Sequence, residues 1–173
     1  MKELILGGVR SGKSCLAEQR ALVSGLHVTY IATATTGDEE MRQRILVHQL
    51  RRPSDWKLIE EPHNLAAVLE AHAHPGHCLV VDCLTLWLTN LLIKNNGADY
   101  TTQREALLTA LPHLPGHIIL VSNETGLGVT PLGELTRRFC DEAGWLHQAL
   151  AGLCERATLT VAGLPITLKG GSL

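Results

Sequence analysis

The sequence has no excess of basic residues and no long apolar run, and each absence excludes a class of protein. Its 173 residues include 15 Lys and Arg against 17 Asp and Glu, which gives a net charge of −2. A protein whose main partner is nucleic acid needs a basic face that neutralises phosphates, so we expect no nucleic-acid partner. No apolar run approaches the ~20 residues that span a bilayer, so we expect no membrane span.

The cysteines lack the C-x-x-C spacing of many metal and redox sites. Their number is odd and most lie in apolar segments, which predicts reduced core residues of a cytoplasmic protein. A strand-like run begins almost at the N-terminus and leaves no room for a signal peptide, which agrees with that location. The five cysteines are Cys15, Cys78, Cys83, Cys140 and Cys154.

Strand-like and helix-like segments alternate along the chain, which is typical of an α/β fold with a mainly parallel sheet. The length and composition suit one globular domain that spans residues 1–173. We therefore expect a three-layer, P-loop NTPase-like fold in which helices flank the sheet. The predicted strands are 3–6, 27–32, 78–82, 117–122 and 157–161, and the predicted helices are 13–24, 38–50, 64–73, 84–94, 102–111 and 132–154.

A glycine-rich loop between the first strand and the first helix predicts a nucleotide site. Residues 7–14 fit the pattern G-x-x-x-x-G-K-[ST], with an apolar strand before them and a helical pattern after them. The backbone N–H groups of such a loop, together with the helix N-terminus, bind phosphates. We expect Lys13 to reach the β- and γ-phosphates and the Ser14 hydroxyl to ligate Mg²⁺. The nucleotide-binding residues predicted from this loop are Gly7, Gly8, Val9, Arg10, Ser11, Gly12, Lys13 and Ser14.

Asp82 is a second candidate for the phosphate site. It closes the apolar run 79–82, and an apolar strand that ends in a carboxylate is the pattern of a Walker B acid, which holds Mg²⁺ directly or through water. Many strands end in Asp only because it suits a turn or a helix cap. The glycine-rich loop favours the metal-binding interpretation.

His48 lies in a basic stretch of the predicted helix 38–50. Arg44 and His48 share one helix face at i, i+4 spacing, and Arg51 and Arg52 follow. Neighbouring arginines disfavour the imidazolium form, and a neutral imidazole is a nucleophile. The spacing alone favours a solvated basic helix face with an incidental histidine.

Two other groups are interpreted as structural. The stretch 72–77 contains three histidines but no cysteine at ligand spacing, and Pro75 and Gly76 mark a turn, so a metal site is not favoured there. The three tryptophans, Trp56, Trp87 and Trp145, are expected to pack in the interior rather than to stack on a ligand.

Several segments, in the same order along nearly the whole chain, resemble one family. It is the bifunctional adenosylcobinamide kinase/adenosylcobinamide-phosphate guanylyltransferase family of cobalamin assembly. The glycine-rich loop is common to many families, but the ordered set is specific. The matching segments are 7–14, 30–34, 38–41, 44–45, 48, 51–53, 56, 60–62, 82–88, 90–92, 122–128, 138–141, 162–165 and 168–169.

The resemblance implies two reactions at one site. ATP or GTP would phosphorylate the aminopropanol hydroxyl of adenosylcobinamide in the presence of Mg²⁺. GMP from GTP would then pass through His48, the catalytic nucleophile, to adenosylcobinamide phosphate, and Lys13 would serve both steps. The family suggests a homotrimer. Further nucleotide-binding positions that the resemblance implies are Ala32, Thr33, Ala34, Gln49, Leu50, Arg51, Arg52, Asp82 and one of Glu60 and Glu61, and Asn123 and Glu124 are candidate site residues.

The chain departs from the family pattern at two places. Thr125 stands where valine is usual, and His147-Gln148 stands where Asn-Gln is common after Gly144. Two other functions stay open at this stage. One is a small-molecule P-loop kinase with no covalent step, which the α-phosphate of GTP would not label. The other is a regulatory NTPase that hydrolyses nucleotide without a cobinamide.

Overall fold

The computed structural model describes residues 1–35 and 53–171. In that part of the chain seven strands form one sheet in the order β3-β2-β4-β5-β1-β6-β7. All neighbouring strands are parallel except β6 and β7, which are antiparallel. The strands are β1 (Lys2–Gly7), β2 (His27–Ala32), β3 (Lys57–Glu60), β4 (His77–Asp82), β5 (His117–Asn123), β6 (Arg156–Val161) and β7 (Leu164–Lys169).

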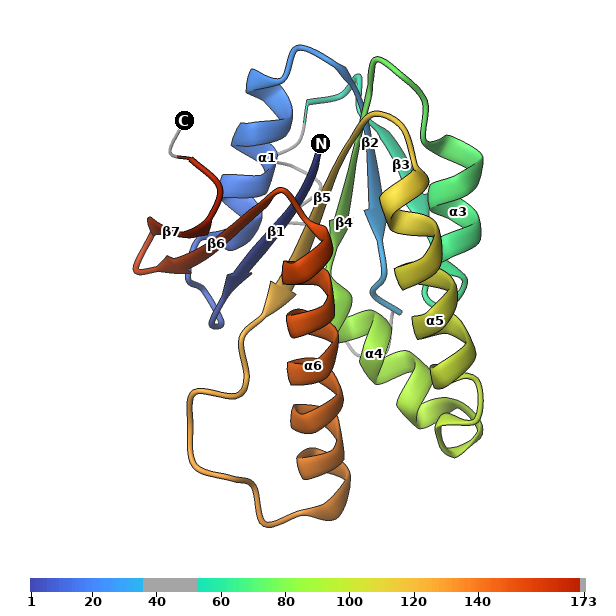
Figure 1. Ribbon diagram of the computed structural model, residues 1–173, viewed down its shortest axis with the longest axis vertical. Helices are drawn as coiled ribbons and strands as arrows, with labels where there is room; N and C mark the ends of the chain where they lie inside the picture. Colours follow the sequence, from blue (N-terminus) through green and yellow to red (C-terminus); the bar gives the residue numbers. More distant parts are fainter. Residues whose placement is uncertain (36–52, 172–173) are drawn as a thin grey trace.

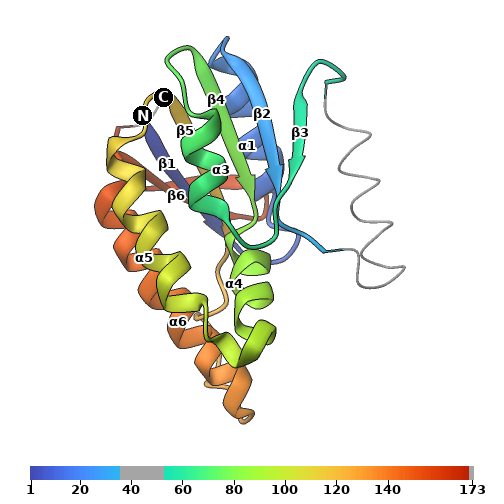
Figure 2. The same ribbon diagram turned by 90° about the vertical axis from the view of Figure 1, so that its right-hand side faces the viewer.

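Helices cover both faces of the sheet (Figure 1), and the view turned by 90° shows α1 behind the sheet with α3, α5 and α6 in front (Figure 2). This confirms the predicted three-layer α/β architecture. The helices are α1 (Lys13–Val23), α3 (Leu65–His72), α4 (Leu84–Ile93), α5 (Tyr100–Ala110) and α6 (Glu134–Leu153), with short 3-10 helices at Lys94–Gly97 and Leu111–His113.

Strand alternation sends apolar side chains to both faces. On the face under α1, Ile5, Val80 and Ile119 pack against Ala17 and Ala21 of the helix. On the other face, the remaining apolar side chains of the same strands pack under α3, α4, α5 and α6. Burial on both faces explains why the central strands are nearly continuous runs of Val, Ile and Leu.

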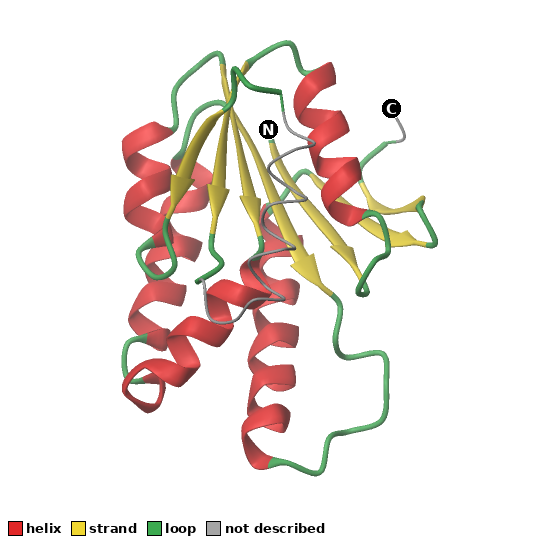
Figure 3. Ribbon diagram, turned by 180° about the vertical axis from the view of Figure 1, so that it is seen from behind, coloured by secondary structure: helices red, strands yellow, loops and turns green. Residues whose placement is uncertain are grey.

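The two edge strands were not predicted from the sequence. β3 is four residues long and only Ile59 is partly buried, while β7 is exposed along its whole length. Neither strand therefore carries the apolar run of a central strand. Figure 3 shows β7 at one end of the sheet, beside β6. The predicted helix 38–50 lies outside the described residues.

The buried residues correct two expectations. All five cysteines are free, as expected, but Cys15 is exposed and Cys140 is only partly buried, so not all of them belong to the core. Trp87 is completely buried, whereas Trp145 is 55% exposed and is not a core residue. No described helix is both long and apolar enough to cross a membrane.

Candidate active site

The glycine-rich loop joins the carboxyl end of β1 to α1, in the strand–loop–helix context that the sequence predicted. Its chain reverses where Arg10 and Gly12 adopt positive φ angles of 56° and 96°. The Ser11 N–H donates to the Gly8 carbonyl at 3.2 Å. Lys13 folds back over the loop, and its Nζ donates to the same carbonyl at 3.2 Å. The ammonium group therefore already lies above the loop that would hold the phosphates.

The hairpin of β6 and β7 supports this loop from one side. The Gly163 N–H donates to the Ser11 carbonyl at 2.8 Å. A Cβ on Gly12 would lie 3.1 Å from the Gly163 Cα, and a Cβ on Gly7 would lie 2.7 Å from the Thr160 carbonyl oxygen. Both glycines are therefore required by the close approach of the hairpin backbone, apart from any contact with phosphate.

Parallel pairing aligns most of the predicted site residues along the carboxyl edge of the sheet. In the register, Gly7 is opposite Asn123, Asp82 is opposite Ala32, and Ala32 is opposite Glu60. Asp82 shares a strand face with Val80 and so points to the side of the sheet that α1 covers. Ligands of parallel α/β sheets bind at this edge.

The magnesium ligands expected from the sequence are Asp82 and Ser14, whose carboxylate and hydroxyl would supply hard oxygen ligands. One Asp82 oxygen, Oδ2, accepts a hydrogen bond from the Tyr30 hydroxyl at 2.8 Å. Within residues 1–35 and 53–171, no three His, Cys, Asp or Glu side chains are grouped to hold a metal ion. A cation at Asp82 would therefore take its remaining ligands from phosphate oxygens and water.

A hydrogen-bonded chain of side chains ties the ends of β2, β4 and β5 together. The Thr33 hydroxyl donates to the Cys83 carbonyl at 2.7 Å and accepts from the Cys83 N–H at 2.9 Å. The Thr85 hydroxyl lies 3.0 Å from the Cys83 Sγ and accepts from the Asn123 amide at 2.9 Å. Burial and the neighbouring Asp82 carboxylate raise the pKa of Cys83 to about 11, so its thiol stays neutral. The Thr33 and Asn123 side chains are thus engaged within the fold.

Glu60 and Glu61 have different surroundings. The Glu61 Oε1 accepts from the backbone N–H groups of His63 and Asn64 at 2.8 and 2.7 Å, just before α3 begins. Glu60 is exposed at the end of β3, opposite Ala32. Of the two, Glu60 is the more exposed.

A largely buried trio, of which the sequence predicted only Glu124 as a site residue, lies at the end of β5. The Nε2 of His147, on α6, is 2.7 Å from the Ser122 hydroxyl, and its Nδ1 is 3.8 Å from the Glu124 Oε2. The Glu124 N–H donates to the Gly7 carbonyl at 3.0 Å, so the trio adjoins the glycine-rich loop. The sequence named Glu124 as a candidate site residue and showed His147 as a departure from the family pattern, but it did not connect the two.

Other predicted positions are less informative. His48, Gln49, Leu50, Arg51 and Arg52 lie outside the described residues. Ala34 lies in the segment that follows β2.

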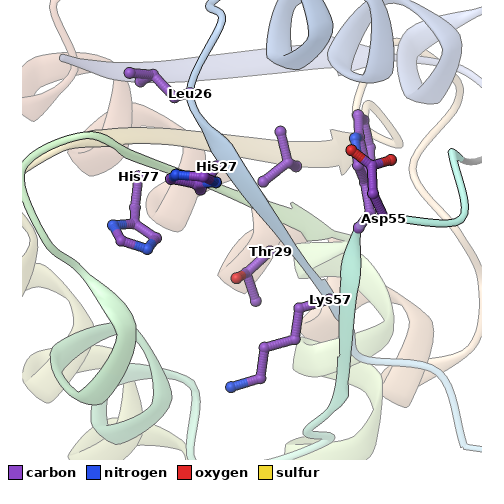
Figure 4. Close-up of a pocket in the computed structure, with 8 residues that line it drawn as sticks. Leu26, His27, Thr29, Asp55, Lys57 and His77 are labelled. Carbon is purple, nitrogen blue, oxygen red and sulfur yellow. The ribbon is translucent and has the colours of Figure 1, made fainter.

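A hollow of about 510 Å³ lies at the opposite, amino edge of the sheet. Figure 4 shows His27 and His77 side by side in it, with Thr29, Lys57 and Asp55 around them. The ring centroids of His27 and His77 are 5.6 Å apart. Because β2, β3 and β4 begin here, this hollow is separate from the carboxyl edge that carries the glycine-rich loop.

Comparison with known proteins adds to this geometry. A curated relative from Pseudomonas aeruginosa, the bifunctional adenosylcobalamin biosynthesis protein CobP, is 64% identical over 100% of both chains. The CobU protein of the same description from Escherichia coli is 35% identical over 98% of this chain and 100% of its own. Among solved structures, the flagellar accessory protein FlaH from Methanocaldococcus jannaschii aligns with a TM-score of 0.50 and 17% identity over 98% of this chain and 78% of its own, a likeness of fold alone.

The family model for cobinamide kinase/cobinamide phosphate guanyltransferase matches residues 3–168. The match thus covers nearly the whole chain. It includes the glycine-rich loop near one end and the β6–β7 hairpin that supports this loop near the other. The protein belongs to the cobinamide kinase/cobinamide phosphate guanyltransferase family.

Proposed function

We propose that this protein phosphorylates the aminopropanol hydroxyl of adenosylcobinamide and then converts the product to adenosylcobinamide-GDP with GTP. The observation that carries the proposal is the glycine-rich loop with Lys13 above it and Asp82 on the same edge of the sheet, in a chain of this family. Its relatives are named bifunctional adenosylcobalamin biosynthesis proteins, which supports both activities.

In the kinase step, the loop N–H groups bind the phosphates of ATP or GTP and orient the γ-phosphoryl group. Lys13 leaves its intramolecular contact with the Gly8 carbonyl and binds the β- and γ-phosphates. Ser14 and Asp82 would hold Mg²⁺, which would supply positive charge beside the transferring group. The Tyr30 hydroxyl fixes the Asp82 carboxylate in that orientation.

In the guanylyl step, His48 attacks the α-phosphate of GTP, a nitrogen–phosphorus bond forms and pyrophosphate leaves. A phosphate oxygen of adenosylcobinamide phosphate then displaces the histidine, which yields the GDP-linked product and restores the enzyme. His48, Arg51 and Arg52 are assigned from the sequence and the family, with the arginines holding the displaced phosphates. The covalent step avoids bringing two polyanions together at once.

Glu60, rather than Glu61, is proposed as the carboxylate that contacts the guanosine. Glu61 already accepts two backbone N–H groups just before α3, and moving it would break both hydrogen bonds. Glu60 is exposed in the same row of the sheet as Ala32 and Asp82. A carboxylate there can accept hydrogen bonds from ribose hydroxyls or the guanine base.

A homotrimer in the cytoplasm is proposed as the working form. Apolar side chains are exposed along the loop that follows β5 and on α6; Figure 1 shows this loop and helix side by side. Leu127, Val129 and Leu132 are between 82% and 97% exposed, and Trp145 is 55% exposed. Such a group of exposed apolar side chains favours association with other copies.

The two activities can be separated by one experiment. Purified protein is incubated with adenosylcobinamide, Mg²⁺ and GTP, and the corrinoid products are identified by mass. We expect adenosylcobinamide phosphate and then adenosylcobinamide-GDP. His48→Asn should stop at the phosphate, and Lys13→Ala should make neither product. Phosphorylation without any GDP-linked product in the unmodified protein would favour a P-loop kinase that has no covalent step.

A further inference from the structure

The Ser122–His147–Glu124 trio has no role assigned to it in the reactions described above. Ser122 is completely buried, so its hydroxyl cannot act on a substrate, and the His147 side chain is 9% exposed. The Glu124 side chain is 20% exposed and is the member that reaches open space. The arrangement therefore has a buried end, at Ser122, and an accessible end, at Glu124.

The chemistry of the trio orients the Glu124 carboxylate. Burial lowers the pKa of His147, although the Glu124 charge opposes this, so the ring is neutral at pH 7 and carries one N–H. When the Ser122 hydroxyl donates to Nε2, that N–H is on Nδ1 and faces the carboxylate. On the other side, the Gly126 N–H donates to Glu124 Oε1 at 2.6 Å. The Gly126 hydrogen bond holds one carboxylate oxygen, and the His147 ring lies 3.8 Å from the other.

The position of Glu124 is set by the sheet. β5 lies between β1, which carries the glycine-rich loop, and β4, which carries Asp82 (Figure 1). Asn123 is opposite Gly7 in the register, and the Glu124 N–H donates to the Gly7 carbonyl at 3.0 Å. Glu124 therefore lies on the carboxyl edge, between the phosphate loop and the proposed metal ligand. The neighbouring Asn123 amide is turned to Thr85 instead.

We propose that Glu124 is the catalytic base that binds the acceptor hydroxyl of the corrinoid, and that His147 is the residue that positions Glu124. This assignment rests on the proposed kinase reaction. The hydroxyl oxygen bonds to the γ-phosphorus while the bond from that phosphorus to the bridging oxygen breaks. The hydroxyl proton passes to Glu124, and the nucleoside diphosphate leaves with the electron pair. Guanylyl transfer does not use Glu124, because its nucleophiles are an imidazole and a phosphate.

The test measures the two half-reactions separately. Phosphorylation is assayed with adenosylcobinamide, ATP and Mg²⁺, and guanylyl transfer with GTP and adenosylcobinamide phosphate prepared in advance. Glu124→Gln keeps an acceptor for the Gly126 N–H but removes the base. We expect the kinase kcat to fall by about 100-fold, with both KM values and guanylyl transfer unchanged. The matched control is Glu134→Gln, an exposed carboxylate in the first turn of α6, which should change nothing.

His147 is tested by two substitutions. His147→Ala should lower the kinase kcat by about tenfold at constant KM, because the carboxylate loses the ring that lies beside its Oε2. His147→Asn, the residue common at this position in the family, should recover part of that loss. An equal loss in both half-reactions, or a kinase of full activity in Glu124→Gln, would overturn the assignment. If the unmodified protein catalyses neither reaction, the proposed function itself fails and this assignment fails with it.

Discussion

Gly7→Ala and Gly8→Ala form a matched pair that tests how the β6–β7 hairpin supports the phosphate loop. Both glycines lie in the same loop, and neither has a positive φ angle. A Cβ on Gly7 would lie 2.4 Å from the Ser11 Oγ and 2.7 Å from the Thr160 carbonyl oxygen, whereas a Cβ on Gly8 would meet nothing within 4 Å. Only Gly7→Ala should therefore damage the protein.

The size of the effect follows from what has to move. Ordinary contact with a Cβ begins near 3.4 Å, and the Thr160 oxygen belongs to the backbone of β6, which is paired with β1. Relief requires a shift of β6 away from β1, and such overpacking costs about 1–3 kcal/mol. For a chain of this size, about 2 kcal/mol corresponds to a fall in Tm of about 4–8 °C. Gly8→Ala should stay within about 0.5 kcal/mol of the unmodified protein.

Thermal unfolding of the three proteins, with and without GTP and Mg²⁺, measures both consequences. We expect Gly7→Ala to lose Tm without nucleotide and to gain less on adding GTP, since the loop itself is displaced. Gly8→Ala should follow the unmodified protein in both conditions. Equal Tm values for the two variants would refute the close packing of the hairpin against the loop.

Three further predictions concern stability and binding. Trp87→Phe removes a hydrogen bond of 2.8 Å from the buried indole N–H to a backbone carbonyl, and it should lower the free energy of unfolding by about 1–3 kcal/mol. Trp145→Phe should change that free energy by less than about 0.5 kcal/mol, and denaturant titration measures both. Burial lowers the pKa of His117 to about 4, so between about pH 6.5 and 4 the unfolded chain binds a proton that the folded chain does not. The free energy of unfolding therefore decreases as the pH is lowered through this range, and His117→Gln should make the decrease in Tm less steep. Glu61→Ala should cost about 1 kcal/mol, because it removes the two hydrogen bonds just before α3, with unchanged GTP affinity by calorimetry. Glu60→Ala should do the reverse.

The central part of the fold could be predicted because each signal was local. The glycine-rich loop fits a pattern of consecutive residues, and the central strands are apolar on both faces. β7 gave no such signal, because all six of its residues are exposed and Pro165 within it argues against a strand. Trp145 was misjudged because aromatic residues are usually buried, whereas this one lies on an exposed face of α6.

The contacts within the site depend on which strands are neighbours, and the sequence does not reveal that order. Tyr30 donates to Asp82 from 52 residues away, because β2 and β4 are adjacent in the sheet. His147 meets Ser122 across 25 residues, because α6 packs back over the sheet next to β5. The motifs therefore predicted a phosphate site at this edge of the sheet, but not which side chains contact its carboxylates.

The measurement that tests the central claim most directly is labelling with GTP that carries its isotope in the α-phosphate. Purified protein is incubated with this GTP and Mg²⁺, denatured, and digested so that any labelled peptide can be mapped. The account predicts a label on the peptide that contains His48, lost in acid and stable in base, as a phosphoramidate requires. A label with the opposite stability, or no label on a protein that still binds GTP, would contradict it.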